Sequence, residues 1–112
     1  MSVRLLDTNN WIALIKGRAP SVMARLESLP ASGIAVCSVV KAELWYGAHR
    51  YEDPEKRRAV ITKWLSPYPS FSFDTEAAIH YGEIRYHLET AGRIIGPNDL
   101  KIAAICRAHC LT

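Results

Sequence analysis

The chain has 112 residues, a length that fits one domain with a single hydrophobic core. Its 49% hydrophobic content excludes intrinsic disorder, and no apolar run approaches the roughly 20 residues of a membrane-spanning helix. The net charge of +3 permits a nucleic-acid partner without requiring one, and the three cysteines, an odd number, favour reduced thiols in the cytoplasm over a disulfide framework.

The first third of the chain alternates short apolar runs with helical patterns. Residues 3–6 predict a short buried strand, and residues 9–16 predict a helix. A second helix is expected over residues 21–29. Residues 34–38 then predict a second strand that is apolar enough to be buried on both faces.

The middle of the chain continues this alternation. A helix is expected to begin near Ser38, which is a good N-cap residue. Another helix is expected to start at Asp53 and to run to about Ser66, with apolar residues at helical spacing. Phe71 and Phe73 alternate with polar residues and indicate a third strand.

The last third predicts two helices. The clearest covers residues 75–92, where Thr75 can cap the start and Gly92 can end the helix. The final helix, capped near Asn98, is apolar on most sides and is expected to be buried. Three strands separated by helices predict an α/β fold, with a short parallel sheet flanked by helices in a single domain over residues 1–112.

Three carboxylates stand out because their neighbours are mostly apolar. Asp7 leaves the first strand, Glu43 lies early in the helix after the second strand, and Asp99 starts the last helix. Ligands of parallel α/β sheets bind beyond the carboxyl ends of the strands, so these side chains can converge there. Converged carboxylates repel one another unless a cation joins them, and Mg²⁺ or Mn²⁺ is the natural partner. The chemistry indicated is metal-assisted hydrolysis of a phosphodiester.

Each carboxylate also has a purely structural interpretation. Asp7 could cap the helix that follows it, and Asp99 could favour the dipole of its own helix. Glu43 could be a surface residue or a structural hydrogen bonder. The site interpretation is preferred because it explains all three positions together.

Three segments resemble a known family. The stretches "LLDTNNWIALIKG", "SVVKAELWYGAHR" and "GRIIGPNDLKIAAICRAH" are similar, in the same order, to the PIN-domain ribonucleases and, among them, to the VapC-type toxins of prokaryotic toxin–antitoxin pairs. The separate motifs are weak to moderate, but their ordered combination is specific and spans nearly the whole chain.

The resemblance implies a small PIN-like α/β fold with an acidic pocket that binds Mg²⁺ or Mn²⁺. It implies cleavage of RNA, with tRNA or ribosomal RNA as the expected substrate, neutralisation by a VapB-type antitoxin, a homodimer, and a cytoplasmic location without membrane contact. It assigns Asp7, Glu43 and Asp99 as catalytic metal ligands, and it gives Thr8 and Asn9 a supporting role.

The chain departs from this family at its C-terminal end. Members typically continue into a further strand with a Thr-x-Asn or Thr-x-Asp motif that supplies a fourth polar site residue, whereas this chain stops at "CRAHCLT". We therefore expect a shortened PIN domain with an unpaired sheet edge and exposed apolar surface. The alternative function is a catalytically impaired relic that only binds an antitoxin.

Basic residues indicate where RNA could bind. Arg50 and Arg57 belong to a basic stretch over residues 49–58, and Arg85 lies near the C-terminal motif. The alternative is a solvated helix face, because acidic residues are interleaved with the basic ones.

Aromatic residues allow similar alternatives. Five aromatic residues could stack on bases, namely Trp11, Trp45, Trp64, Tyr46 and Tyr51. Such residues are more often core or a groove for a partner helix. We expect Trp64 to lie in the core, and Trp45 and Tyr46 to face an antitoxin or a dimer partner.

Two further chemistries are weighed and disfavoured. Cys106, His109 and Cys110 could suggest zinc, but no fourth ligand is evident in the sequence. Asp7 could be a covalent nucleophile as in haloacid-dehalogenase phosphotransfer enzymes, but that pattern needs a second Asp where this chain has Asn9.

Overall fold

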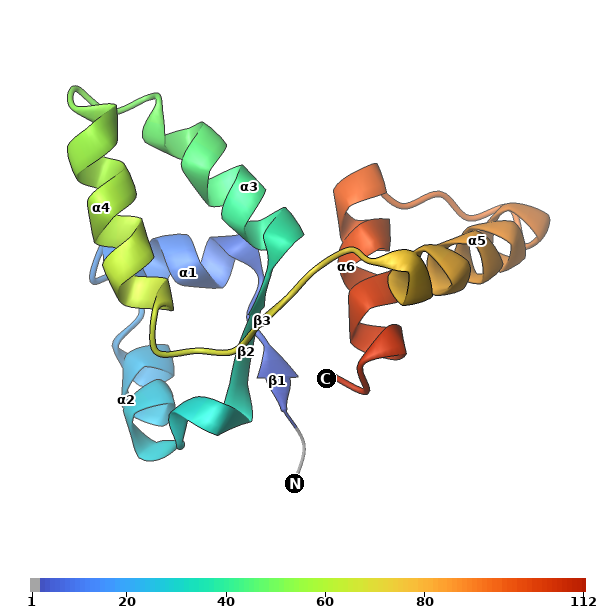
Figure 1. The fold of residues 1–112 in the computed structure, drawn as a ribbon, viewed down its shortest axis with the longest axis horizontal. Helices are drawn as coiled ribbons and strands as arrows, with labels where there is room; N and C mark the ends of the chain where they lie inside the picture. Colours follow the sequence, from blue (N-terminus) through green and yellow to red (C-terminus); the bar gives the residue numbers. More distant parts are fainter. Residues whose placement is uncertain (1–2) are drawn as a thin grey trace.

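The fold is an α/β sandwich around a short parallel sheet, seen in a computed structural model that describes residues 3–112 (Figure 1). The strands are β1 (Arg4–Leu5), β2 (Ile34–Cys37) and β3 (Ser70–Phe71), and they lie in the order β1-β2-β3. Helices α1, α2 and α4 lie on one side of the sheet in Figure 1, and α5 and α6 lie on the other. The predicted α/β fold with a short parallel sheet is therefore confirmed.

The six α-helices lie where the hydrophobic periodicity predicts them, to within a few residues at their ends. Their bounds are α1 (Thr8–Ile15), α2 (Pro20–Ser28), α3 (Ser38–Ala48), α4 (Pro54–Leu65), α5 (Thr75–Thr90) and α6 (Pro97–Ala108). A single 3₁₀ turn, Ala31–Gly33, leads from α2 into β2.

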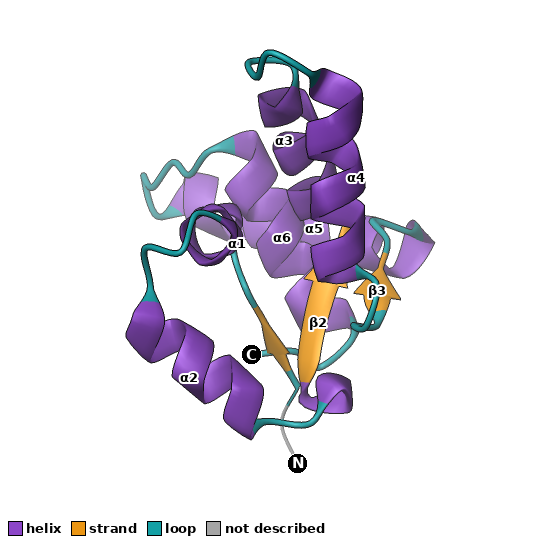
Figure 2. Ribbon diagram, turned by 90° about the vertical axis from the view of Figure 1, so that its left-hand side faces the viewer, coloured by secondary structure: helices purple, strands orange, loops and turns teal. Residues whose placement is uncertain are grey.

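Strand β2 is the centre of the fold. All four of its residues are buried, because it pairs with a parallel neighbour on each side and helices cover both faces (Figure 2). Arg4 lies opposite Ile34, and Cys37 lies opposite Phe71. The apolar run predicted as a fully buried strand is therefore confirmed.

Aspartates cap three of the helices. The side chain of Asp53 accepts a hydrogen bond from the Lys56 backbone N–H at the start of α4, and Asp74 accepts one from Ala77 at the start of α5. Asp7 does the same for α1, as described below. Each bond satisfies a backbone donor that the first helical turn leaves unpaired.

Three predicted caps are wrong. Cys37, not Ser38, is the N-cap of α3, because the Ser38 hydroxyl instead accepts a hydrogen bond from the Phe73 backbone N–H at 3.2 Å. Asp74 takes the cap position expected of Thr75, since its carboxylate reaches the free N–H of the first turn. The N-cap of α6 is Gly96 rather than Asn98, because Pro97 already begins that helix.

The hydrophobic core lies between the sheet and its helices. Trp11 is fully buried and therefore has no free face for stacking on a base. Trp64 and Trp45 are half-buried and pack against the core, which supports the core assignment of Trp64 but only partly the surface role of Trp45. Tyr46, with 66% of its surface exposed, is accessible as predicted.

The chain returns to β1 after α6. The Leu5 N–H donates to the Thr112 carbonyl at 3.1 Å, the Thr112 N–H donates to the Val3 carbonyl at 2.9 Å, and Val3 and Leu111 form a parallel bridge. The expectation of an unpaired edge is therefore wrong for this part of β1, because the residues after α6 pair with it.

Within residues 3–112, the structure contains no helix long and apolar enough to cross a membrane.

A strained residue ends α6. Cys110 has a φ of 54°, a left-handed conformation that brings the Leu111 N–H onto the Cys106 carbonyl at 2.8 Å. Glycine adopts this conformation without a Cβ clash, so we expect Cys110→Gly to raise the free energy of unfolding by about 1 kcal/mol. Chemical denaturation checks this, and Cys110→Ala is the control because it removes the thiol and keeps the Cβ. A glycine variant less stable than the alanine variant would contradict the strain.

The cap of α5 predicts a pH dependence. The Ala77 N–H holds the pKa of Asp74 below its ordinary 3.8, assisted by the nearby His109. A carboxylate with a lowered pKa in the folded chain stabilises it above the unfolded value and loses that effect as pH falls through the folded value. Asp74→Asn should therefore have a lower free energy of unfolding than the parent at pH 6, and the difference should shrink as the pH falls below the ordinary pKa of 3.8. Denaturation of both proteins at pH 6 and below pH 3.8 measures this difference. A difference that does not change with pH would contradict the prediction.

Candidate metal and RNA site

Asp7 connects the end of β1 to the start of α1. Its Oδ1 accepts a hydrogen bond from the Asn10 backbone N–H at 2.8 Å, so the structural interpretation of Asp7 as a helix cap is correct. The residue is exposed, and among residues 3–112 its Oδ2 accepts no hydrogen bond. The cap fixes the direction of the carboxylate while one oxygen still faces solvent.

A hydrogen bond between α1 and α3 joins Glu43 to the residue that follows Asp7. The Thr8 hydroxyl donates to Oε1 of Glu43 at 3.1 Å, and both residues are half-buried. They are 35 positions apart in the chain and meet because β1 pairs in parallel with β2, which brings α1 into contact with α3. Thr8 thus holds one oxygen of the glutamate, and its role in supporting a metal site stays a prediction.

Asp99 lies in the first turn of α6 and is exposed. Helix α6 packs against α3, and it ends where Leu111 reaches Val3 at the start of β1. Its first turn therefore lies toward the opposite end of the sheet, where β1 and β2 finish (Figure 1). This topology places Asp99 at the same end of the fold as Asp7 and Glu43.

The carboxylates do not form a closed cage. In the part of the chain that the structure describes, no three His, Cys, Asp or Glu side chains form a group that could hold a metal ion. The chemistry of the individual side chains suits a hard cation, because each offers carboxylate oxygens and one oxygen of Asp7 is uncommitted. Mg²⁺ keeps several of its waters in protein sites and needs only one or two carboxylates directly.

Asn9 lies in the first turn of α1 and is exposed. Its backbone position follows that of Thr8, but its side chain makes no hydrogen bond that the structure shows within residues 3–112. A supporting role for Asn9 therefore stays a prediction.

Two of the three candidate RNA-binding arginines lie beside Glu43. Arg50 and Arg57 line a cavity of about 350 Å³ that Glu43 also lines, between α1, α3 and α4. Lys16 also lines this cavity, although it was not among the residues predicted to bind RNA. Its sequence position could have indicated this, because Lys16 lies four residues after Ile12 and so continues the same helical face.

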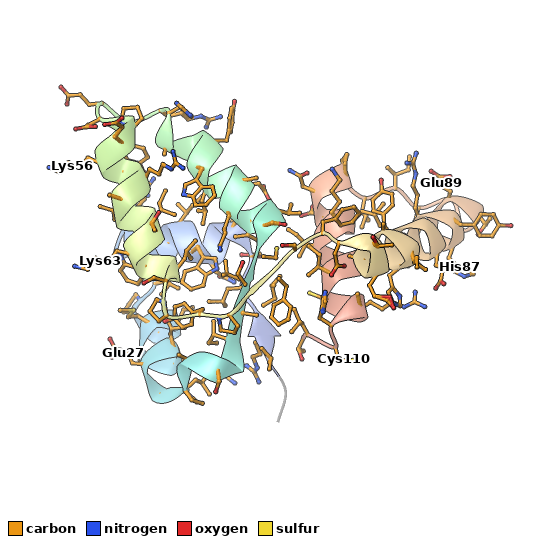
Figure 3. The ribbon with its side chains drawn as sticks, viewed as in Figure 1. Glu27, Lys56, Lys63, His87, Glu89 and Cys110 are labelled. Atoms are coloured by element: carbon orange, nitrogen blue, oxygen red, sulfur yellow. The ribbon has the colours of Figure 1, made fainter. Side chains whose placement is uncertain are left out.

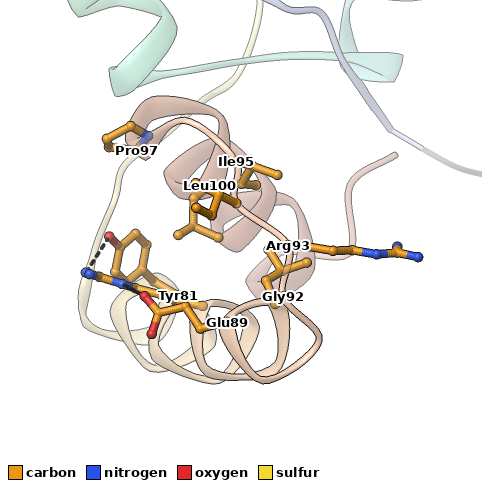
Figure 4. A pocket seen from close by; sticks show the side chains of 10 residues that line it. Tyr81, Glu89, Gly92, Arg93, Ile95, Pro97 and Leu100 are labelled. Carbon is orange, nitrogen blue, oxygen red and sulfur yellow. Dashed lines mark hydrogen bonds and ion pairs between the residues drawn. The ribbon is translucent and has the colours of Figure 1, made fainter.

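Arg85 belongs to a different part of the fold. It lies on α5 and donates to Glu89 Oε1 at 2.9 Å, and it lines a second, mainly apolar cavity of about 680 Å³ (Figure 4). Glu89 and the Tyr81 hydroxyl hold its guanidinium, which raises the pKa of Arg85. The structure therefore does not bring Arg85 to the cavity beside Glu43.

The cysteine-rich end of α6 has a structural role. The Nε2 of His109 lies 3.5 Å from Asp74 Oδ2, and its ring packs on Phe71. Cys106 is half-buried, and burial raises the pKa of its thiol. These contacts tie α6 to the start of α5.

Comparison with known proteins identifies the family. The PIN domain family matches residues 4–112. Ribonuclease VapC2 of Haemophilus influenzae is 38% identical over 105 residues, which are 94% of this chain and 79% of that protein. The tRNA(fMet)-specific endonuclease VapC of Salmonella typhimurium is 37% identical over 88% of this chain and 74% of its own length.

Solved structures show the same fold. DNA-bound VapBC from Salmonella typhimurium matches with a TM-score of 0.89 and 35% identity, over 99% of this chain and 83% of that one. VapBC2 from Rickettsia felis, bound to a promoter DNA fragment, matches with a TM-score of 0.87 and 33% identity, over 97% of this chain and 83% of that one. The chain belongs to the PIN-domain family and, within it, to the VapC group.

Proposed function

We propose that this chain is an endoribonuclease toxin that uses Mg²⁺ or Mn²⁺ to hydrolyse phosphodiester bonds, with tRNA or ribosomal RNA as substrate. Relatives named ribonuclease and tRNA(fMet)-specific endonuclease support the activity. The observation that carries the proposal for these residues is the Thr8–Glu43 hydrogen bond, because it fixes a glutamate against the residue that follows Asp7 at the exit of β1.

The acidic residues divide the work. Asp7, Glu43 and Asp99 would hold the metal, which when bound supplies an activated water and neutralises the leaving oxygen. Thr8 orients Glu43 by occupying Oε1, so that Oε2 is the oxygen left for binding. The Asn10 N–H likewise orients Asp7 by donating to Oδ1, so that Oδ2 is the oxygen left for binding. Asn9, on the exposed first turn, is proposed to assist from outside this set.

The proposed partners follow from surface features and relatives. VapBC complexes among the structural neighbours support a VapB-type antitoxin as the partner. Large apolar side chains exposed on α5 and the loop after it support a homodimer, namely Ile79, Tyr86, Ile94 and Ile95. An RNA substrate of this kind places the proposed activity in the cytoplasm.

Loss of the proposed metal ligands should abolish cleavage. Asp7→Asn keeps a side chain that can cap α1, and Asp99→Asn changes an exposed residue, so both variants should fold. We expect each to lose more than the roughly 10–100-fold that removal of a supporting partner costs. The measurement is cleavage of a tRNA pool by the purified chain, with Mg²⁺ or Mn²⁺ against EDTA.

Cleavage that persists with EDTA, or in both variants, would contradict the proposed site. A folded parent chain that cuts no RNA in either metal would instead support the alternative of a protein that only binds an antitoxin.

The Thr8 hydroxyl gives a separate prediction. Thr8→Val removes the donor to Glu43 and should weaken Mn²⁺ binding by roughly 10–100-fold, whereas Thr8→Ser keeps the hydroxyl and should stay near the parent. The Mn²⁺ concentration that gives half-maximal cleavage measures the effect. Equal metal dependence in the valine and serine variants would show that the hydrogen bond does not serve the metal site.

A further inference from the structure

A groove leads away from Glu43 between α1, α3 and α4. The polar and aromatic residues that line this groove are Lys16 at the end of α1, Glu43 of α3, Arg50 and Tyr51 in the loop after α3, and Arg57 of α4; Ile12 of α1 is among its apolar residues. Its volume is about 350 Å³. Because Glu43 bonds Thr8 at the start of α1, one end of the groove adjoins the candidate metal site.

The charges of the groove favour an anionic occupant. Lys16, Arg50 and Arg57 line it with three positive charges, against the single carboxylate of Glu43. That carboxylate lies at the end where the metal is proposed to bind, and every other charged residue that lines the groove is basic. A polyanion with charges at regular intervals matches this arrangement.

An aromatic ring holds Arg57 in place along the groove. Its guanidinium stacks on the Tyr51 ring, with the carbon Cζ 4.2 Å from the ring centroid. Its Nε is buried and has no hydrogen-bond partner within residues 3–112, so this atom is out of reach of a ligand. The side chain as a whole is half-buried and lines the groove, so it offers a ligand the outer part of its guanidinium. Phosphate oxygens suit a guanidinium that is already oriented by stacking.

The aromatic and apolar walls suit bases. Tyr51 lines the groove beside Arg57 and is 38% exposed. Outside the groove lining, Arg50 also lies over the Tyr46 ring, with its Cζ 5.4 Å from the ring centroid. Aromatic rings next to cations along a groove are the combination by which proteins bind single-stranded nucleic acid without reading its sequence. An acidic peptide would use the cations but not the alternation of stacking faces with them.

We propose that this groove binds the single-stranded RNA segment next to the scissile phosphodiester, with Lys16 and Arg57 on phosphates and Tyr51 against a base. The proposal rests on the proposed ribonuclease function and names where its substrate lies. Arg50, at the rim, adds charge to the same path.

Binding without cleavage tests the groove. The probe is a short fluorescein-labelled single-stranded RNA, and fluorescence anisotropy with the full chain in EDTA gives its affinity over a range of salt concentrations. We expect Arg57→Gln and Lys16→Gln each to bind several-fold more weakly at low salt. Each should also lower the slope of log affinity against log salt by about 0.7.

Matched controls carry the same loss of charge elsewhere. Lys63 of α4 points away from the body of the molecule (Figure 3), and Lys63→Gln is the control for Lys16→Gln. Arg25 is exposed on α2, and Arg25→Gln is the control for Arg57→Gln. Lys16 is itself exposed, so its variant keeps the test valid if loss of the Arg57 stacking disturbs the fold.

Three results would overturn the groove proposal. The groove variants could bind the RNA like the parent, or the controls could lose as much affinity as the groove variants. A third result is that the groove variants bind the RNA like the parent but bind a second probe, a labelled acidic and apolar peptide, more weakly than the parent does. That result would make the groove a peptide-binding site.

Failure of the proposed function is distinguishable from these results. RNA that binds through the groove but is never cut in Mg²⁺ or Mn²⁺ would refute the nuclease and leave the groove standing. Cleavage with an unchanged KM in both groove variants would refute the groove and leave the nuclease standing.

Discussion

The parallel pairing of β1 with β2 is the constraint on which the candidate site depends. Helix α1 follows β1 after Leu6 and Asp7, and α3 follows β2 directly, so parallel pairing brings α1 and α3 into contact at one end of the sheet. The Thr8–Glu43 hydrogen bond spans that junction, and the groove begins beside it. An antiparallel pairing of the same strands would place these residues at opposite ends of the sheet.

Strand and helix positions were predictable because their apolar patterns are strong. The apolar run of β2 predicts a buried strand, and the helical spacing of apolar residues in α5 predicts a helix. The caps were less predictable, since adjacent residues compete for the same backbone donor. Asp74 and Thr75 are both residue types that cap helices well, and Asp74 takes the position. The Ser38 hydroxyl instead accepts a hydrogen bond from the Phe73 N–H, a contact made only in the folded chain. Local sequence cannot show which tertiary partner a hydroxyl will find.

The candidate site was predictable where topology alone places a residue. Asp7 and Glu43 follow neighbouring parallel strands, and the structure links them through Thr8. Arg85 could not be excluded from this area by sequence, because its distance from the site depends on how α5 projects from the sheet (Figure 1). Lys16 was missed because one lysine after an apolar helix face resembles an ordinary solvated end.

Asp7 illustrates how one residue can serve both structure and chemistry. Its Oδ1 caps α1, and that bond orients the carboxylate whose other oxygen faces solvent. A helix cap is thus compatible with metal binding. Glu43 is similar, because one of its oxygens accepts the Thr8 hydrogen bond and the other remains for a ligand. The chain positions its acids with ordinary hydrogen bonds, and a cation would supply the attraction that holds like charges together.

A crystal structure of the chain grown with Mn²⁺ would show whether Asp7, Glu43 and Asp99 hold the metal, because anomalous scattering locates the metal without reference to activity. We expect one Mn²⁺ peak or more within bonding distance of carboxylate oxygens from these three residues. A well-folded chain whose Mn²⁺ lies elsewhere, or that binds none at these carboxylates, would contradict it.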